Sequence, residues 1–134
     1  DLDLAKERSQ QNPVYYVQYA HARCTSILRN AQDVQNEAHN MNLNLLKEKE
    51  ELDLIKKMLH LPEVIADTAH DFQVQRVPHY ALDLARAFHH FYEKHRVITD
   101  DVALTAARLT LVVGVQIVLR NTLALMHIDS PETM

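Results

Sequence analysis

The chain has 134 residues, of which 47% are hydrophobic and 24% are charged. This balance is typical of one globular domain with an apolar core and argues against a disordered or fibrous chain. With one glycine and four prolines, the chain lacks the turn-forming residues that a sheet of many short strands needs. The same count argues against the glycine-rich loops that hold nucleotide phosphates, so no cofactor is expected to bind this chain.

Cysteine and charge content indicate a compartment and exclude some partners. The lone cysteine, Cys24, can form neither an internal disulfide nor a thiolate zinc cage, which indicates a reduced, cytoplasmic setting. We recognise no signal peptide and expect no apolar run of membrane-spanning length, hence a soluble chain without a membrane partner. The formal net charge of −4 argues against general polyanion binding, DNA included, although residues 76–96 carry a basic excess.

The first part of the chain predicts a linker, a long helix and a loop. Residues 1–11 are predicted to be a linker, and Asn12 followed by Pro13 is a typical helix start. Apolar residues then recur at three- and four-residue steps to Ala31, which predicts one long helix. Residues 32–44 are rich in asparagine, which favours turns, so a loop is expected there.

Two helices are predicted next. The second runs from Leu45 to Leu59, and Pro62 begins a short third helix. Residues 47–57 interleave four acidic residues with four lysines, a pattern typical of a solvated helix face. The expected apolar faces of these helices are Leu45, Leu52, Ile55 and Leu59 for the second, and Ile65, Ala69 and Phe72 for the third.

The last two predicted helices complete the fold class. The fourth begins at Val77-Pro78, and a break at residues 97–101 ends with acidic residues that suit the start of a fifth helix, which runs to about His127. Gly114, inside this helix, predicts a close helix crossing. The sequence therefore predicts an all-α bundle of about five helices. The expected apolar face of the fourth helix is Tyr80, Leu84, Ala87, Phe88 and Phe91.

Neither a metal site nor a catalytic residue is predicted. His89, His90 and His95 do not form the one-faced pair that a helical zinc site requires. Cys24 follows His21 by three residues but falls on the apolar stripe of the first helix, which favours a core position. No serine has the glycine turn that would expose it as a nucleophile.

Aromatic residues beside arginines are the most informative pattern. The first helix places Tyr19 four residues before Arg23, and the fourth helix places Tyr92 four residues before Arg96. An aromatic ring beside a guanidinium suits an unstacked RNA base and its phosphate. Core packing is the alternative for such aromatic residues, and for Tyr92 we leave the two interpretations open.

Four blocks carry a resemblance to a known family. These are residues 12–23 (NPVYYVQYAHAR), 61–66 (LPEVIA), 80–92 (YALDLARAFHHFY) and 104–109 (LTAARL). In this order and spacing they resemble the C-terminal, DALR-type anticodon-binding domain of bacterial arginyl-tRNA synthetases. Residues 105–108, Thr-Ala-Ala-Arg, depart from the Asp-Ala-Leu-Arg stretch that gives this domain its label.

The resemblance implies a domain organisation, partners and a site. Residues 1–11 would be the linker from a class I catalytic domain that activates arginine with ATP, and residues 12–134 the anticodon-binding domain. The partners would be the anticodon loop of arginine tRNA and that catalytic domain. The implied RNA-binding residues, with Arg96 added from the aromatic pattern, are Tyr19, Arg23, Tyr92, Arg96 and Met134. Arg108 is expected to anchor helices through an acidic partner instead.

Two functions of other classes remain as alternatives. One is a stand-alone helical module that binds a partner helix through an apolar face. The other is a small metalloenzyme, which metal analysis of the pure chain would detect. RNA binding differs from helix binding in its steep loss of affinity with salt.

Overall fold

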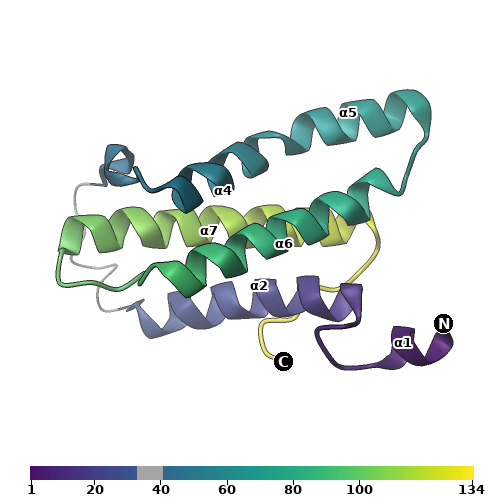
Figure 1. The fold of residues 1–134 in the computed structure, drawn as a ribbon, viewed down its shortest axis with the longest axis horizontal. Helices are drawn as coiled ribbons and strands as arrows, with labels where there is room; N and C mark the ends of the chain where they lie inside the picture. Colours follow the sequence, from purple (N-terminus) through teal and green to yellow (C-terminus); the bar gives the residue numbers. More distant parts are fainter. Residues whose placement is uncertain (33–40) are drawn as a thin grey trace.

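A computed structural model describes residues 1–32 and 41–134, and these residues form an all-helical bundle (Figure 1). Five long helices confirm the predicted fold class, and the described residues contain no strand. A short helix, α1, precedes them, and a three-residue 3-10 helix, η1, precedes α4. The elements are α1 (Leu2–Lys6), α2 (Pro13–Asn30), η1 (Leu43–Leu45), α4 (Lys49–Leu59), α5 (Leu61–Asp71), α6 (Arg76–Lys94) and α7 (Val102–Leu125).

Helix α7 is the central element of the bundle. It contacts α2, α4 and α6, so apolar residues are buried around most of its circumference. In Figure 1, α2 lies on one side of α6 and α7, and α4 with α5 lies on the other. The predicted face of the fourth helix is confirmed, because Phe88 and Phe91 in α6 are fully buried in the core.

The apolar character of α7 corrects one expectation. Over 18 residues this helix has a mean hydropathy of 2.0, so it is long and apolar enough to cross a membrane by length and composition. The expectation that no such run exists is therefore wrong. Half of that stretch is buried inside the bundle, and the buried side chains of α7 include Thr105, Arg108 and Thr122. A helix surrounded by three others needs an apolar surface on most sides.

Helix α2 begins where the sequence predicts. The Asn12 side chain accepts hydrogen bonds from the backbone N–H groups of Val14 and Tyr15, and Pro13 occupies the first turn. The Asn12 amide also donates to the carbonyls of Ala5 and Glu7, which holds the preceding segment against the helix start. Of the loop predicted over 32–44, residues 33–40 lie outside the described part of the chain.

Helix α4 differs from its prediction in start and in face. It begins at Lys49, because Glu48 and Glu51 form a capping box that fixes the first turn. The predicted apolar face is correct only in part: Leu45 and Ile55 pack against the core, whereas Leu52 is 40% exposed, Leu59 is 73% exposed and the fully buried residue is Leu54. The solvated acidic face is wrong, because Glu50 and Glu51 are buried.

Helix α5 also presents a different face from the one predicted. Ile65, Ala69 and Phe72 are exposed, and Val64 is the buried residue. The reason is that α5 packs mainly on α6, with a small contact to α4, so one narrow stripe is covered. Phe72 ends the helix in the left-handed backbone region, with φ of 58°.

The crossing predicted at Gly114 lies between α7 and α4. A Cβ atom at Gly114 would lie 3.2 Å from the sulfur of Met58 in α4. The missing side chain at Gly114 thus leaves room for the Met58 side chain between the two helices. This contact positions α4 against the core.

Candidate nucleic-acid interface

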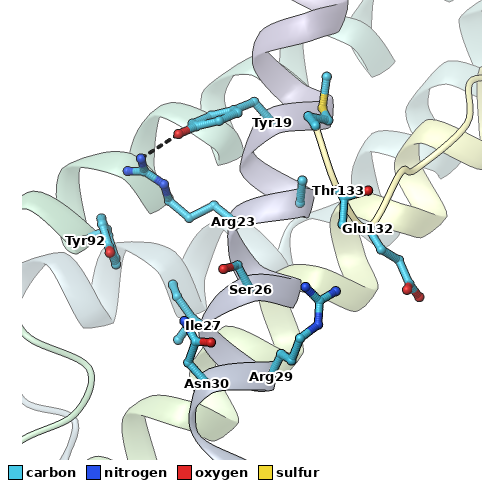
Figure 2. A pocket seen from close by; sticks show the side chains of 11 residues that line it. Tyr19, Arg23, Ser26, Ile27, Arg29, Asn30, Tyr92, Glu132 and Thr133 are labelled. Carbon is cyan, nitrogen blue, oxygen red and sulfur yellow. Dashed lines mark hydrogen bonds between the residues drawn. The ribbon is translucent and has the colours of Figure 1, made fainter.

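A cavity of about 380 Å³ opens where α2, the end of α6 and the C-terminal segment meet (Figure 2). We call it the tyrosine cavity, after Tyr19 and Tyr92. Arg23, from α2, lies between these two residues. The remaining lining residues are Ala22, Ser26, Ile27, Arg29, Asn30, Glu132, Thr133 and Met134.

Arg23 joins the two tyrosines. Its guanidinium carbon lies 5.0 Å from the centre of the Tyr19 ring and 4.7 Å from the centre of the Tyr92 ring, and its Nη2 donates a 2.7 Å hydrogen bond to the Tyr19 hydroxyl. Within the described residues, no carboxylate pairs with Arg23. The cation is thus held by π faces and one hydroxyl, which leaves donors for an anionic ligand.

The rings of Tyr16, Tyr19 and His89 pack together beside the tyrosine cavity. The His89 ring stacks on Tyr19 at 5.9 Å between centres and lies 5.0 Å from Tyr16. Burial, together with the nearby charge of Arg23, lowers the pKa of His89 to about 4. Its Nε2 atom has no hydrogen-bond partner in the described part of the chain. His89 is therefore neutral at pH 7 and adds no charge beneath the cavity.

The C-terminal segment turns back onto α2. Helix α7 ends with His127 in the left-handed region, with φ of 55°, and the N–H of Ile128 bonds to the carbonyl of Leu123. Gln18 then donates to the carbonyl of Asp129, and the His21 ring bonds to the carbonyl of Pro131. These contacts bring Met134 to the same cavity as Tyr19 and Tyr92, two of the residues with which the resemblance groups it.

Arg96 lies at a neighbouring cavity. This second cavity, of about 370 Å³, is formed by Ile27, Asn30 and Tyr92 together with residues 95–98. We call it the isoleucine cavity, after Ile27 and Ile98. Of the five predicted site residues, four thus share one cavity and Arg96 belongs to the other. Tyr92 is 38% exposed and lines both cavities, so it is not a core residue.

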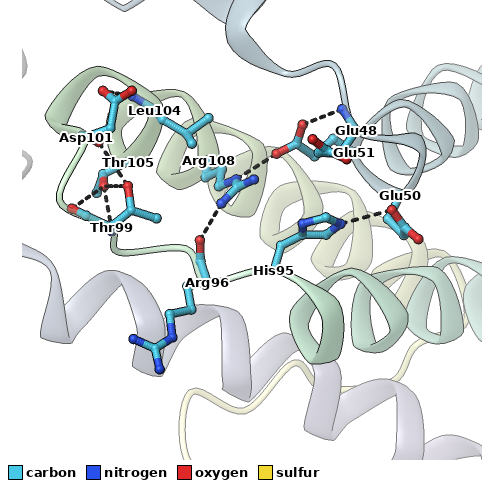
Figure 3. A network of polar contacts seen from close by, with 10 residues as sticks. All are labelled: Glu48, Glu50, Glu51, His95, Arg96, Thr99, Asp101, Leu104, Thr105 and Arg108. Atoms are coloured by element: carbon cyan, nitrogen blue, oxygen red, sulfur yellow. Dashed lines mark hydrogen bonds and ion pairs between the residues drawn. The ribbon is translucent and has the colours of Figure 1, made fainter.

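The loop that carries Arg96 is fixed by a buried ionic junction (Figure 3). Arg108 donates a 2.7 Å hydrogen bond from Nε to Glu51, which is fully buried, and a second of 2.7 Å from Nη1 to the carbonyl of Arg96. The expectation that Arg108 anchors helices through an acidic partner is confirmed. This junction joins α4, α7 and the segment after α6.

Glu50, a second carboxylate of α4, binds residues at the C-terminal end of α6 beside this junction. Glu50 accepts hydrogen bonds of 2.9 Å from His95 and from Lys94, and these bonds lower the pKa of Glu50 to about 2. The ligand atoms of Glu48, Glu50 and His95 lie within 4.8 Å of one another, which would allow a metal ion. The ammonium of Lys94 already bonds to Glu50, so this group is better described as an ion-pair cluster than as a metal site.

Cys24 and His21 have structural roles. Cys24 is fully buried, and burial raises the pKa of its thiol well above the usual value, which keeps it protonated. His21 is buried and bonds to the tail, as described above. Cys24 is a core residue, as predicted.

Sequence reasoning missed the residues that extend the tyrosine cavity along α2. Ser26, Ile27 and Asn30 follow Arg23 by three, four and seven positions, so they continue the helix face that begins with Tyr19. The spacing was available in the sequence. The tail residues Glu132 and Thr133 had no periodic signal.

Comparisons with known proteins agree on one family. The DALR anticodon binding domain matches residues 17–134. The arginine–tRNA ligase of Dehalococcoides mccartyi is 49% identical over the whole chain, which covers 24% of that protein. The structure of a Campylobacter jejuni protein titled an arginyl tRNA synthetase superposes with a TM-score of 0.86 at 25% identity, over the whole chain and 29% of that protein. The Thermus thermophilus arginyl-tRNA synthetase superposes with a TM-score of 0.78 at 32% identity, over 89% of this chain and 21% of that one.

These matches concern a minor part of each relative. The chain spans about a quarter of the length of the arginine–tRNA ligases that it matches.

Proposed function

Since the chain belongs to the DALR anticodon-binding domain family, we propose that it binds the anticodon loop of an arginine tRNA at the tyrosine cavity. It does so as part of a longer arginine–tRNA ligase in the cytoplasm. ATP-dependent activation of arginine takes place in a separate catalytic domain of that ligase. Residues 1–11 connect the two domains, and residues 12–134 form the RNA-binding one.

The observation that carries this proposal is the arrangement around Arg23. A guanidinium that lies against two tyrosine rings, with no acidic partner among the described residues, offers π faces for an unstacked base and N–H donors for a phosphate. Met134 lines the same cavity and supplies a flexible thioether that can pack on a base.

Local charge supports the proposal although the whole chain is acidic. Three arginines, Arg23, Arg29 and Arg96, line the two cavities, and among the side chains that line them Glu132 is the sole acidic one. An RNA strand would therefore meet a basic surface at the two cavities, whereas most of the acidic side chains of the chain lie outside them. Phosphate contacts at this surface would fix the register of the RNA.

The test is a titration of the 134-residue chain with a fluorescein-labelled anticodon stem-loop of arginine tRNA, followed by anisotropy at several salt concentrations. We expect affinity to fall steeply as salt rises, because phosphate contacts release counterions. Tyr19→Ala should weaken binding about tenfold, since one base–aromatic stack is lost. Tyr19→Phe retains the stack and serves as the matched control.

Two results would contradict the proposal. Salt-independent binding of the stem-loop would do so, and so would a Tyr19→Ala variant that binds as tightly as the unmodified chain. Either result would favour the helical interaction module, for which the exposed apolar residues of α5 would then be the first surface to examine.

A further inference from the structure

The isoleucine cavity has the features of a second site for an RNA nucleotide. Its volume of about 370 Å³ nearly equals that of the tyrosine cavity. The two share Ile27, Asn30 and Tyr92, so these side chains separate two cavities of similar size. Figure 2 shows Ile27 and Asn30 on the same stretch of α2, with Tyr92 facing them from α6.

The lining of the isoleucine cavity combines apolar walls with free polar groups. Ile98 is 45% exposed, although it lies in a well-anchored loop. The guanidinium of Arg96 and the amide of Asn30 have no hydrogen-bond partner in the described ranges. In Figure 3 the side chain of Arg96 points away from the ionic junction, toward α2. Apolar faces with a few convergent donors suit a flat base and its phosphate.

The walls of this cavity are fixed before any ligand arrives. Arg108 holds the carbonyl of Arg96, and the backbone N–H of Thr99 donates to the hydroxyl of Thr105 at 2.9 Å. His95 is held by Glu50 on the other side of the loop. A preorganised wall lowers the entropic cost of binding, so this loop is suited to recognition.

We propose that the isoleucine cavity binds the base of a second unpaired nucleotide, the neighbour of the one in the tyrosine cavity on the same RNA strand. Ile98 and Tyr92 contact the base, Asn30 bonds to its edge, and Arg96 bonds to its phosphate. This inference rests on the proposed function, and it adds a second base-binding site to the tyrosine cavity.

The experiment is a double-mutant cycle between protein and RNA. The chain is titrated with anticodon stem-loops in which one loop nucleotide at a time is abasic, so that the base is removed and the backbone is kept. The protein variants are Ile98→Glu, Ile98→Ala and Tyr19→Ala. Ile117→Glu is the matched control, because Ile117 is 39% exposed on α7 and lines neither cavity.

We expect Ile98→Glu to weaken binding of the intact stem-loop about tenfold, and Ile98→Ala to weaken it less. With one abasic position the penalty of Ile98→Ala should disappear and that of Ile98→Glu should shrink to its repulsion of the phosphate, because the base that both variants affect is already absent. The penalty of Tyr19→Ala should disappear at an adjacent position instead. Ile117→Glu should show no dependence on any position.

Other outcomes separate the failure of this inference from that of the proposed function. If Ile98→Glu costs the same with every RNA, or no more than Ile117→Glu, the isoleucine cavity holds no base, while a position-specific effect of Tyr19→Ala keeps the tyrosine cavity. If the wild-type chain does not bind the stem-loop, or Tyr19→Ala has no effect, the proposed function is overturned. Circular dichroism of Ile98→Ala and Ile98→Glu shows whether both variants fold.

Discussion

Arg108 and Arg23 place the same functional group in two opposite surroundings. Arg108 is 7% exposed, and its Nε and Nη1 atoms donate to Glu51 and to the carbonyl of Arg96. Arg23 is half-buried against two tyrosine rings and makes one side-chain hydrogen bond, to Tyr19. Arg108 lines neither of the two cavities, whereas Arg23 lines the tyrosine cavity.

The difference shows how to separate structural from ligand-binding arginines. A buried guanidinium must be paired, because an unpaired charge in the interior is strongly destabilising. A guanidinium on π faces remains partly solvated and keeps donors for a ligand. Substitutions at Arg108 and Arg23 test this contrast directly, and substitutions at His89 and Gly114 test the packing around the two arginines.

The largest effect is expected at the ionic junction. Arg108→Ala removes the partner of a fully buried carboxylate and should lower the free energy of unfolding by about 3–5 kcal/mol. Urea denaturation of the variant measures this. Arg108 itself lines neither cavity, so the loss of stability should exceed the loss of stem-loop affinity, which arises only through the loop that carries Arg96.

A double variant provides the control. Replacing both partners, as in Glu51→Leu with Arg108→Leu, leaves no uncompensated charge and should cost less than Arg108→Ala alone. Equal losses in the single and double variants would show that the guanidinium packs as an apolar group and that its charge is unimportant.

At the tyrosine cavity the expected effect is on binding. Arg23→Ala should weaken binding of the stem-loop about tenfold and reduce the salt dependence by about one counterion. Its stability should change by less than about 1 kcal/mol, because the side chain is not enclosed. Arg23→Lys keeps the charge without the planar contact to both rings and should restore the salt dependence but not the full affinity. A large loss of stability in Arg23→Ala would remove the contrast with Arg108.

A smaller effect concerns the ring layer beneath Arg23. The pKa of His89 is about 4 in the folded chain, below the usual value of about 6.5, so the unfolded chain binds a proton first as the pH falls. The stability that neutral His89 contributes is complete above pH 6.5 and is lost between pH 6.5 and pH 4. The loss should be on the order of 1 kcal/mol, since partial exposure screens the effect.

Denaturation at several pH values checks this, with His89→Phe as the control. Phenylalanine keeps a ring against Tyr16 and Tyr19 and does not titrate, so the stability of the variant should fall less than that of the unmodified chain over that range. Below pH 4.5 both proteins should lose stability, because Glu50 is protonated first in the unfolded chain, its pKa being lowered to about 2 in the folded one. An unchanged slope in His89→Phe would assign the pH dependence to another group.

The smallest effect is expected at the α4–α7 crossing. Gly114→Ala places a methyl group 3.2 Å from the end of the flexible Met58 side chain, which can move. Alanine also favours a helix over glycine by about 1 kcal/mol. The two effects oppose each other, so the free energy of unfolding should change by less than about 0.5 kcal/mol. A loss above about 2 kcal/mol would show that close packing, rather than the ionic junction, determines how α4 is seated.

Local signals were sufficient for most helix boundaries. The caps at Asn12 and Asp101 and the prolines at positions 13, 62 and 78 each mark a helix start to within a few residues. The face of a helix was harder to predict when few neighbours cover it. Leu52 and Phe72 have the right spacing for a core stripe, but the interior contacts Glu51 and Val64 instead. Periodicity reports a possible face, and the tertiary contacts select which one is buried.

The candidate site was predicted in its residue types and partly in its geometry. The four-residue steps from Tyr19 to Arg23 and from Tyr92 to Arg96 were visible, but no local rule shows that Tyr19, Arg23 and Tyr92 meet around one guanidinium. That Arg96 lies on the far side of Tyr92 depends on the backbone turn at residues 95–101. The buried Glu51 resembled a solvated residue because its partner, Arg108, is 57 positions away.

The returning C-terminal segment has a practical consequence for protein production. Gln18 and His21 hold its backbone on α2, and Met134 lines the tyrosine cavity. A purification tag fused after Met134 would therefore leave the chain beside Tyr19 and Arg23, where a polyhistidine sequence could cover the opening or compete with an anionic ligand. A tag placed before Asp1 precedes α1, none of whose residues is buried. For binding measurements a tag is best added at that end.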